Sequence, residues 1–181
     1  MKGEPTRLEI FLTKLAFIFY GKRVYKVFAD RLPLHGGERV LDFGCGMGTV
    51  AYYAAGRLTD GYLTCLDISK RWLSACRRTL RRYENVSFYH SGREIPALAE
   101  NSFNVVYCHF VLHDIAPNEL EGVIVALAKS LQSGGVLVFR EPLHEAETLN
   151  RVKRLTEQNG LSLKGSRITD VPLIGNVLEG I

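Results

Sequence analysis

The stretch that decides the fold is RVLDFGCGMG, residues 39–48. It begins with an apolar run of the kind that forms a buried strand, and glycines follow at positions 44, 46 and 48. Glycines let the backbone turn sharply and approach a ligand, with the amides of the next helix facing it. The pattern predicts a strand, a ligand-binding loop and a helix in succession, the first unit of an α/β sheet.

Two details of this loop indicate the kind of ligand. The spacing is GxGxG, and Thr49 stands where a dinucleotide-binding GxGxxG loop would place its last glycine. Asp42 lies two residues before the first glycine. A carboxylate at this place repels a pyrophosphate and suits a cationic ligand. A nicotinamide-dependent oxidoreductase is therefore disfavoured.

A second acid follows the next apolar run. Leu63-Thr-Cys-Leu-Asp-Ile-Ser69 reads as a strand that ends in Asp67, 23 residues after Gly44. An acid about 20 residues beyond such a loop accepts hydrogen bonds from ribose hydroxyls. Alone, Asp67 also fits the N-cap of the following helix. Together with the glycine loop it predicts a ligand of adenosine type.

In the rest of the chain, short apolar runs alternate with longer amphipathic ones, a pattern typical of an α/β fold. Strands alternating with crossover helices run parallel, so their carboxyl ends and the ligand share one edge. The tail from Leu161 has room for one strand and a short second one. The expected strands are 39–43, 62–66, 86–89, 103–108 and 136–139, and the expected helices are 48–58, 70–83, 117–131 and 145–159.

Length and composition limit the possible fold and function classes. With 181 residues, 46% hydrophobic and 23% charged, the chain predicts a single globular domain over residues 1–181. A net charge of +4 is below the balance of a dedicated nucleic-acid binder. The four cysteines form no CxxC pair, which favours buried thiols in a cytoplasmic protein and no metal site.

Residues 5–33 precede the first strand and predict one long or two shorter helices. Three interpretations stay open: a helix packed on the sheet edge, a lid over the substrate, and a helix on a membrane surface, because basic residues flank its Phe-rich run. The run from Leu15 to Tyr20 is far shorter than the roughly 18 apolar residues of a membrane span. The expected division is a helical cap (1–35), a cofactor-binding core (36–160) and a C-terminal strand region (161–181).

These motifs resemble those of the class I, Rossmann-like S-adenosylmethionine-dependent methyltransferases, from about residue 35 to 160. The family's first motif is an acid, one residue and GxGxG, as at residues 42–48, and its ribose acid matches Asp67. The resemblance implies a three-layer, doubly wound, mostly parallel sheet of six to seven strands with the N-terminal helices as a cap. It also implies S-adenosyl-L-methionine as cofactor and Ile68 packed on adenine.

One turn departs from the family pattern. After the third strand the family often has a Gly-Asp-Ala type turn whose acid meets the adenine amine, and here Ser91 and Gly92 stand in its place. Ser91 still accepts a hydrogen bond but carries no charge. The residues expected to hold the cofactor are Asp42, Gly44, Cys45, Gly46, Gly48, Asp67, Ile68, Ser91, Gly92 and His109.

Two histidines, His109 and His113, are the candidate catalytic residues. His109 is expected beside the methionine end of the cofactor and His113 facing the substrate pocket, and either could serve as a general base where the acceptor is protonated. A structural role for these histidines stays open as the alternative. A metal-binding site formed by the two histidines is disfavoured, because no Glu follows His109 as it does in the zinc-binding motif HExxH. Weaker candidates for the base are Tyr20, Tyr25 and Glu141.

The expected activity is methyl transfer to a small-molecule acceptor. No membrane span is expected, a nucleic-acid partner is disfavoured, and a homodimer is left open. Two other functions stay open: a non-catalytic or partner-dependent module that binds the cofactor, and an RNA or protein methyltransferase. A solvated face is the preferred interpretation of the basic side chains on the helix after the second strand, and an RNA or acidic-protein contact is the alternative. These side chains are Lys70, Arg71, Arg77, Arg78, Arg81 and Arg82.

Overall fold

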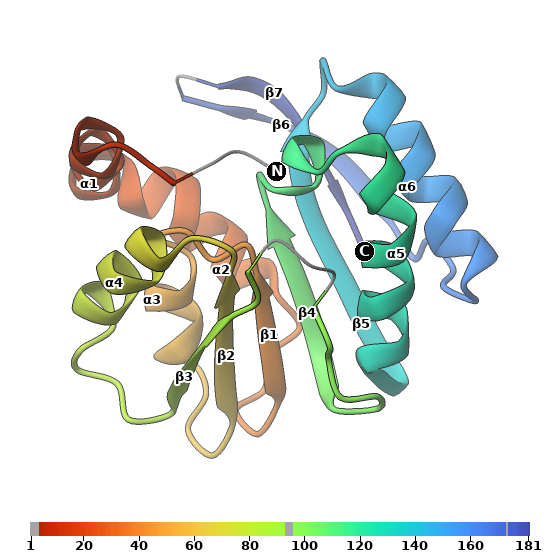
Figure 1. The fold of residues 1–181 in the computed structure, drawn as a ribbon, viewed down its shortest axis with the longest axis horizontal. Coiled ribbons are helices and arrows are strands. Elements are labelled where there is room, and N and C mark those ends of the chain that lie inside the picture. Colours follow the sequence, from red (N-terminus) through yellow and green to blue (C-terminus); the bar gives the residue numbers. More distant parts are fainter. Residues whose placement is uncertain (1–3, 93–95, 173) are drawn as a thin grey trace.

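A seven-stranded sheet forms the centre of the computed structural model, which describes residues 4–92, 96–172 and 174–181. The strand order is β3-β2-β1-β4-β5-β7-β6 (Figure 1). The first five strands run parallel, and β7 runs antiparallel to both of its neighbours. This confirms the predicted mostly parallel α/β sheet. The strands are β1 Arg39–Phe43, β2 Tyr62–Asp67, β3 Val86–His90, β4 Phe103–His109, β5 Leu131–Pro142, β6 Ser166–Val171 and β7 Gly175–Gly180.

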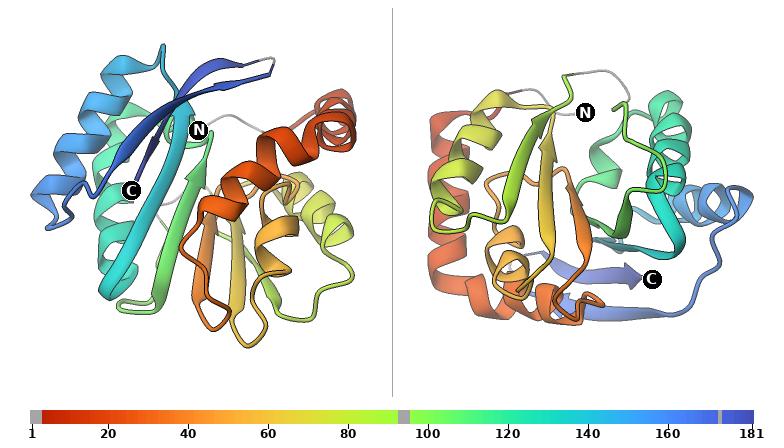
Figure 2. Two further views of the ribbon diagram at one scale, coloured as in Figure 1. Left: turned by 180° about the vertical axis from the view of Figure 1, so that it is seen from behind. Right: turned by 90° about the horizontal axis from the view of Figure 1, so that it is seen from below.

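Helices cover both faces of the sheet. Figures 1 and 2 show α3 and α4 on one face and α5 and α6 on the other. The α-helices are α1 Arg7–Gly21, α2 Val27–Arg31, α3 Ala51–Ala55, α4 Lys70–Thr79, α5 Pro117–Ser130 and α6 Ala146–Gln158. A π-helical turn, η1 (Lys22–Lys26), joins α1 to α2, and a 3-10 turn, η2 (Leu112–Asp114), follows β4.

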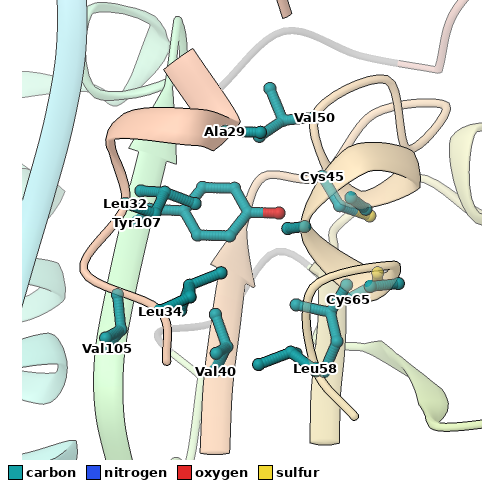
Figure 3. Close-up of a cluster of buried hydrophobic side chains, with 14 of the residues drawn as sticks. Ala29, Leu32, Leu34, Val40, Cys45, Val50, Leu58, Cys65, Val105 and Tyr107 are labelled. Atoms are coloured by element: carbon teal, nitrogen blue, oxygen red, sulfur yellow. The ribbon is translucent and has the colours of Figure 1, made fainter. Parts of the chain in front are cut away.

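The alternation of side chains along β1 supplies two cores. Val40 packs with the residues of α2, α3 and α4, whereas Leu41 and Phe43 pack under α5 and α6. Figure 3 shows part of the first core, where Ala29 and Leu32 lie beside Tyr107 of β4. Both faces of β1 are covered from Val40 to Phe43, and three of these four residues are apolar, as expected for a central parallel strand.

Three of the predicted helices begin within one residue of the predicted start, whereas the helix predicted over 70–83 ends already at Thr79. The Ser69 hydroxyl accepts a hydrogen bond from Trp72 N at 3.0 Å, and α4 begins at Lys70 as predicted. The helix after the glycine loop is shorter than predicted and begins only at Ala51. The backbone φ angles of Gly46 (+52°) and Gly48 (+79°) exclude right-handed helix through the loop.

The N-terminal residues form one helical stretch from Arg7 to Arg31, in which the π turn η1 directly connects the α-helices α1 and α2. Thr6 and Glu9 form a reciprocal capping box at its start. At the other end of the chain two six-residue strands, β6 and β7, fill the tail. None of the helices in the described ranges is long and apolar enough to cross a membrane.

Candidate functional site

A cavity of about 480 Å³ opens where β1, β2 and β4 end. The glycine loop, the end of β2 and the segment after β4 form its floor and walls. The N-terminal segment contributes Pro5, Glu9, Leu12 and Thr13 to its lining. This is the carboxyl edge of the parallel strands, where ligands bind in open α/β sheets.

The structure brings most of the predicted cofactor residues together in this cavity. Those that line it are Asp42, Gly44, Cys45, Gly46, Asp67, Ile68 and His109. The predicted residues outside the lining are Gly48, Ser91, Gly92 and His113. Tyr25, one of the weaker candidates for a base, also lines the cavity, whereas Tyr20 and Glu141 do not.

Apart from histidine, the ionisable groups with a charge at neutral pH in the described lining are all acidic. Four acids contribute to it, Glu9, Asp42, Asp67 and Asp114, and no Lys or Arg does among the described residues. The cavity therefore favours a cationic ligand and disfavours one that carries phosphates.

One buried polar atom at the cavity, His109 Nε2, lacks a hydrogen-bond partner within the described chain. Burial raises the pKa of Asp42 well above its usual range, and the neighbouring Tyr107 hydroxyl acts in the opposite direction. Burial, followed by the positive charge of Arg140, lowers the pKa of His109 well below its usual range. Orphaned buried polar atoms are rare in native proteins, so His109 Nε2 indicates a ligand with polar groups of its own.

Asp67 is held rigidly at the end of β2. Its Oδ2 accepts a hydrogen bond from Gly46 N and its Oδ1 accepts one from Ser69 N, both at 2.9 Å. Burial raises the pKa of Asp67, and these two amides act in the opposite direction. Each carboxylate oxygen keeps a further acceptor position, so the group can still accept hydrogen bonds from two neighbouring hydroxyls.

The turn after β3 lies near this edge without reaching the cavity. Ser91 N donates to Asp67 O at 3.3 Å, and the Ser91 hydroxyl contacts Gly92 O at 3.4 Å. His90 Nε2 lies 2.9 Å from Ile68 O and fastens the end of β3 to that of β2. Residues 93–95, which continue the turn, lie outside the described part of the chain.

The two predicted catalytic histidines lie in different surroundings. His109 is packed among the rings of Tyr25, Phe28 and Phe110, with centroids 5.6, 4.9 and 4.3 Å away. His113 lies behind the cavity wall, where its Nδ1 is 2.5 Å from Glu141 Oε2.

Glu141 is fully buried and organises the segment after β4. Its Oε1 accepts hydrogen bonds from Val111 N (3.0 Å) and Leu112 N (2.8 Å), while Oε2 faces His113. The hydrogen bond that Glu141 accepts from the His113 ring is the main reason that the pKa of His113 is raised. Since Val111 and Asp114 line the cavity, this pair fixes part of the cavity wall.

Sequence reasoning missed Glu4, which lies over the start of α4. Its carboxylate accepts hydrogen bonds from the Ser69 hydroxyl (2.6 Å), Lys70 N (3.0 Å) and Arg71 N (3.2 Å). A carboxylate at a helix N-terminus is favourable there, and the Ser69 hydroxyl is the main cause of the lowered pKa of Glu4. The contact fastens the N-terminal segment beside Asp67. No motif marks a capping acid 65 residues away in sequence.

Three cysteines also converge, although their spacing gives no sign of it. The sulfur atoms of Cys45, Cys65 and Cys76 lie within 4.8 Å of one another, all buried beneath the glycine loop. Hydrogen bonds from Cys45 and Cys65 lower the pKa of Cys76 to about 5. Each of the three comes from a different element that shapes the cavity, namely the loop, β2 and α4.

Comparisons with known proteins match this chain to methyltransferases. A family model described as a methyltransferase domain matches residues 40–135. The demethylmenaquinone methyltransferase of Tropheryma whipplei (strain Twist) is 30% identical over 113 residues, which cover 62% of this chain and 45% of that protein. The aklanonic acid methyltransferase DauC of Streptomyces sp. (strain C5) is 30% identical over 115 residues, covering 62% and 51%. The chain thus spans about half the length of these curated relatives.

Solved structures show the same fold. A SAM-dependent methyltransferase from Aquifex aeolicus superposes with a TM-score of 0.77 over 98% of both chains, at 16% sequence identity. At this identity the likeness concerns the fold alone.

Proposed function

The chain belongs to the methyltransferase-domain family, and from that membership we propose that it is an S-adenosylmethionine-dependent methyltransferase that acts on a small organic molecule. The observation that carries the proposal is the lining of the cavity. It combines the family's glycine loop with four acids and no Lys or Arg among the described residues.

The lining fits this cofactor better than it fits a dinucleotide. S-adenosylmethionine carries a positive sulfonium, a positive ammonium group and one carboxylate, and no phosphate. Its net charge is positive, so a lining whose acidic groups have no Lys or Arg beside them among the described residues complements it. Asp67 would hold the ribose hydroxyls, and Ile68 and Trp72 supply apolar surface for the adenine ring. The buried Asp42 carboxyl would gain a cationic neighbour, which relieves the cost of ionising it in place.

When bound, the cofactor supplies an electrophilic methyl group, and the protein's task is mainly to align the acceptor with it. His109 is the candidate for contact with the reacting end, because it lines the cavity and stays neutral, with Nε2 unpaired within the described chain. We assign His113 and Glu141 a positioning role, since both lie behind the wall that they fix.

The acceptor class is inferred from size and from relatives. A cavity of about 480 Å³ lies in the range of roughly 300–1,000 Å³ that is typical of small-molecule sites. The two relatives described above are named for demethylmenaquinone and aklanonic acid, both small organic molecules. All four cysteines are free and buried, which fits a reducing compartment such as the cytoplasm.

Titration calorimetry with S-adenosylmethionine, S-adenosylhomocysteine and NADH tests the proposal. We expect binding of the first two and none of NADH. Asp67→Ala should weaken cofactor binding at least about tenfold, through the loss of two ribose hydrogen bonds of roughly 1 kcal/mol each.

Asp60→Ala, at an exposed turn before β2, is the matched control and should bind as the parent does. Thermal unfolding of both variants separates loss of a contact from loss of the loop that Asp67 holds. Absence of cofactor binding at millimolar concentration would refute the proposal. Binding without methyl transfer to any small molecule of a screened set would favour a non-catalytic module.

A further inference from the structure

Helix α1 exposes a stripe of large apolar side chains that the cavity does not explain. We define the α1 stripe as Leu8, Phe11, Leu12, Ile18 and Phe19. Each of these side chains is more than half exposed, and Phe19 reaches 73%. They account for five of the ten exposed large hydrophobic residues among those described, on one helix of 15 residues.

The stripe is one face of a helix whose other face is already packed. Spacings of three, four, seven and eleven residues place its members on the same side of α1. On the opposite side Phe17 packs against Tyr52 and Tyr53, with ring centroids 5.4 and 5.9 Å apart. Leu8, Phe11, Ile18 and Phe19 therefore point away from the cavity and the core, and Leu12 stands at the edge of the stripe that borders the cavity.

The charge around the stripe is positive. Arg7 and Lys14 border it along the helix, and Lys22 and Arg23 follow at its C-terminal end. Residues 4–26 carry a net charge of +3, and residues 70–82, which include α4, carry +6 without a single acid. The whole chain carries only +4, so the rest of the molecule is net negative. Figures 1 and 2 show α1 and α4 at the same end of the molecule.

We propose that α1 lies in the surface of an anionic lipid bilayer, with the α1 stripe inserted among the acyl chains and the basic residues at the headgroups. An apolar face with cationic flanks on a helix too short to span is the pattern of an interfacial helix. Anionic headgroups complement the positive end of the molecule, and the attraction weakens as salt is raised.

The stripe also borders the cavity. Leu12 belongs to the stripe and lines the cavity, and Glu9 and Thr13 of the same helix line it as well. A helix seated in the bilayer would therefore place the cavity beside the lipid. This step rests on the proposed function: an acceptor dissolved in the bilayer would reach the methyl donor without crossing bulk water.

Vesicle sedimentation tests the proposal with the chain as it stands. The probes are vesicles of phosphatidylglycerol and phosphatidylcholine, compared with vesicles of phosphatidylcholine alone. We expect binding to the anionic vesicles that falls as salt is raised. Phe11→Ser combined with Phe19→Ser should lower the partition coefficient at least tenfold. The control, Leu163→Ser combined with Ile168→Ser, removes two exposed apolar side chains (48% and 59%) elsewhere on the surface and should bind as the parent does.

A second variant keeps the test independent of the phenylalanines. Lys14→Glu combined with Arg23→Glu should also lower binding to anionic vesicles at least tenfold. Circular dichroism and S-adenosylhomocysteine calorimetry report whether each variant keeps its fold and cofactor site, so failure of the lipid proposal is distinct from failure of the methyltransferase proposal. The lipid proposal is overturned if the parent does not bind anionic vesicles or if the Phe11→Ser, Phe19→Ser variant binds them as strongly as the parent does. It is also overturned if sedimentation velocity shows that the stripe forms a dimer instead.

Discussion

At the scale of single residues, two histidines four positions apart have acquired opposite properties. His109 is packed among aromatic rings, and desolvation there lowers its pKa well below the usual value. His113 is half-buried, and its hydrogen bond with Glu141 raises its pKa. A free histidine side chain has the same pKa of about 6.5 wherever it stands in the sequence, so the surroundings decide which imidazole is neutral.

Proton NMR titration of the imidazole rings should separate the two residues. We expect His109 to stay neutral down to well below pH 6.5, and His113 to titrate above it. Because the folded pKa of His113 exceeds the unfolded value of about 6.5, its stabilising contribution is complete below that pH and is lost as pH rises through the folded pKa.

His113→Gln assigns the resonance, and Glu141→Gln should return the His113 titration toward pH 6.5. If His113 in the parent protein titrates at or below 6.5, the ion pair with Glu141 does not form in solution.

Sequence spacing predicted the cavity residues that belong to local motifs and missed those that the fold brings in from elsewhere. Asp42 and Asp67 stand at fixed distances from the glycine loop, so both could be predicted. Glu4 reaches the same edge from 65 residues away, and the three thiols under the loop come from three elements. Such contacts depend on tertiary packing, which no local pattern records.

At the scale of elements, the glycine loop and the turn after β4 fit together through Gly44. A Cβ at this position would lie 2.3 Å from Val111 Cγ2 and 2.8 Å from Val111 Cβ, and φ is +74°. Val111 cannot easily retreat, because Glu141 holds its amide at 3.0 Å. The loop therefore needs glycine here for close packing as well as for its turn.

Gly44→Ala should lower the free energy of unfolding by at least about 2 kcal/mol, from backbone strain and overpacking together. It should also weaken S-adenosylhomocysteine binding, because the loop lines the cavity. Gly37→Ala is the control: it has open space around its Cβ and should change stability by no more than about 0.5 kcal/mol. Urea unfolding measures both variants, and equal stabilities would contradict the packing argument.

The N-terminal helical stretch is the element for which the sequence left three interpretations open. The structure shows it packed on α3 through Phe17 and, at the same time, lining the cavity. Periodicity alone could not decide between these roles, because apolar residues occur around much of α1. The neighbours of each face, which only the fold supplies, separate the packed side from the exposed stripe.

At the scale of the whole molecule, the N-terminal stretch is tied to the far side of the sheet by one buried ion pair. Arg140 of β5 and Glu179 of β7 are 1% and 7% exposed, and Arg140 Nε donates to Glu179 Oε1 at 3.0 Å. Arg140 Nη1 also donates to Val24 O at 2.7 Å, and Arg31 Nη1 donates to Glu179 Oε1 at 2.8 Å. The pair thus joins η1 and α2 to the antiparallel strands that close the sheet.

Removing one partner tests how much this ion pair contributes to the free energy of unfolding and to the position of the N-terminal stretch. Glu179→Ala leaves the Arg140 guanidinium buried without its counter-ion, which typically costs about 3–5 kcal/mol of stability. Asp170→Ala, an exposed acid on the same hairpin, should cost less than about 1 kcal/mol, so urea unfolding of the two variants isolates the buried pair. Since Arg140 holds the segment that covers the cavity, S-adenosylhomocysteine binding should weaken in Glu179→Ala under conditions where the protein is still folded. Equal binding in the two variants would mean that the other contacts of the N-terminal stretch, among them those of Glu4 and Phe17, hold it at the cavity without this pair.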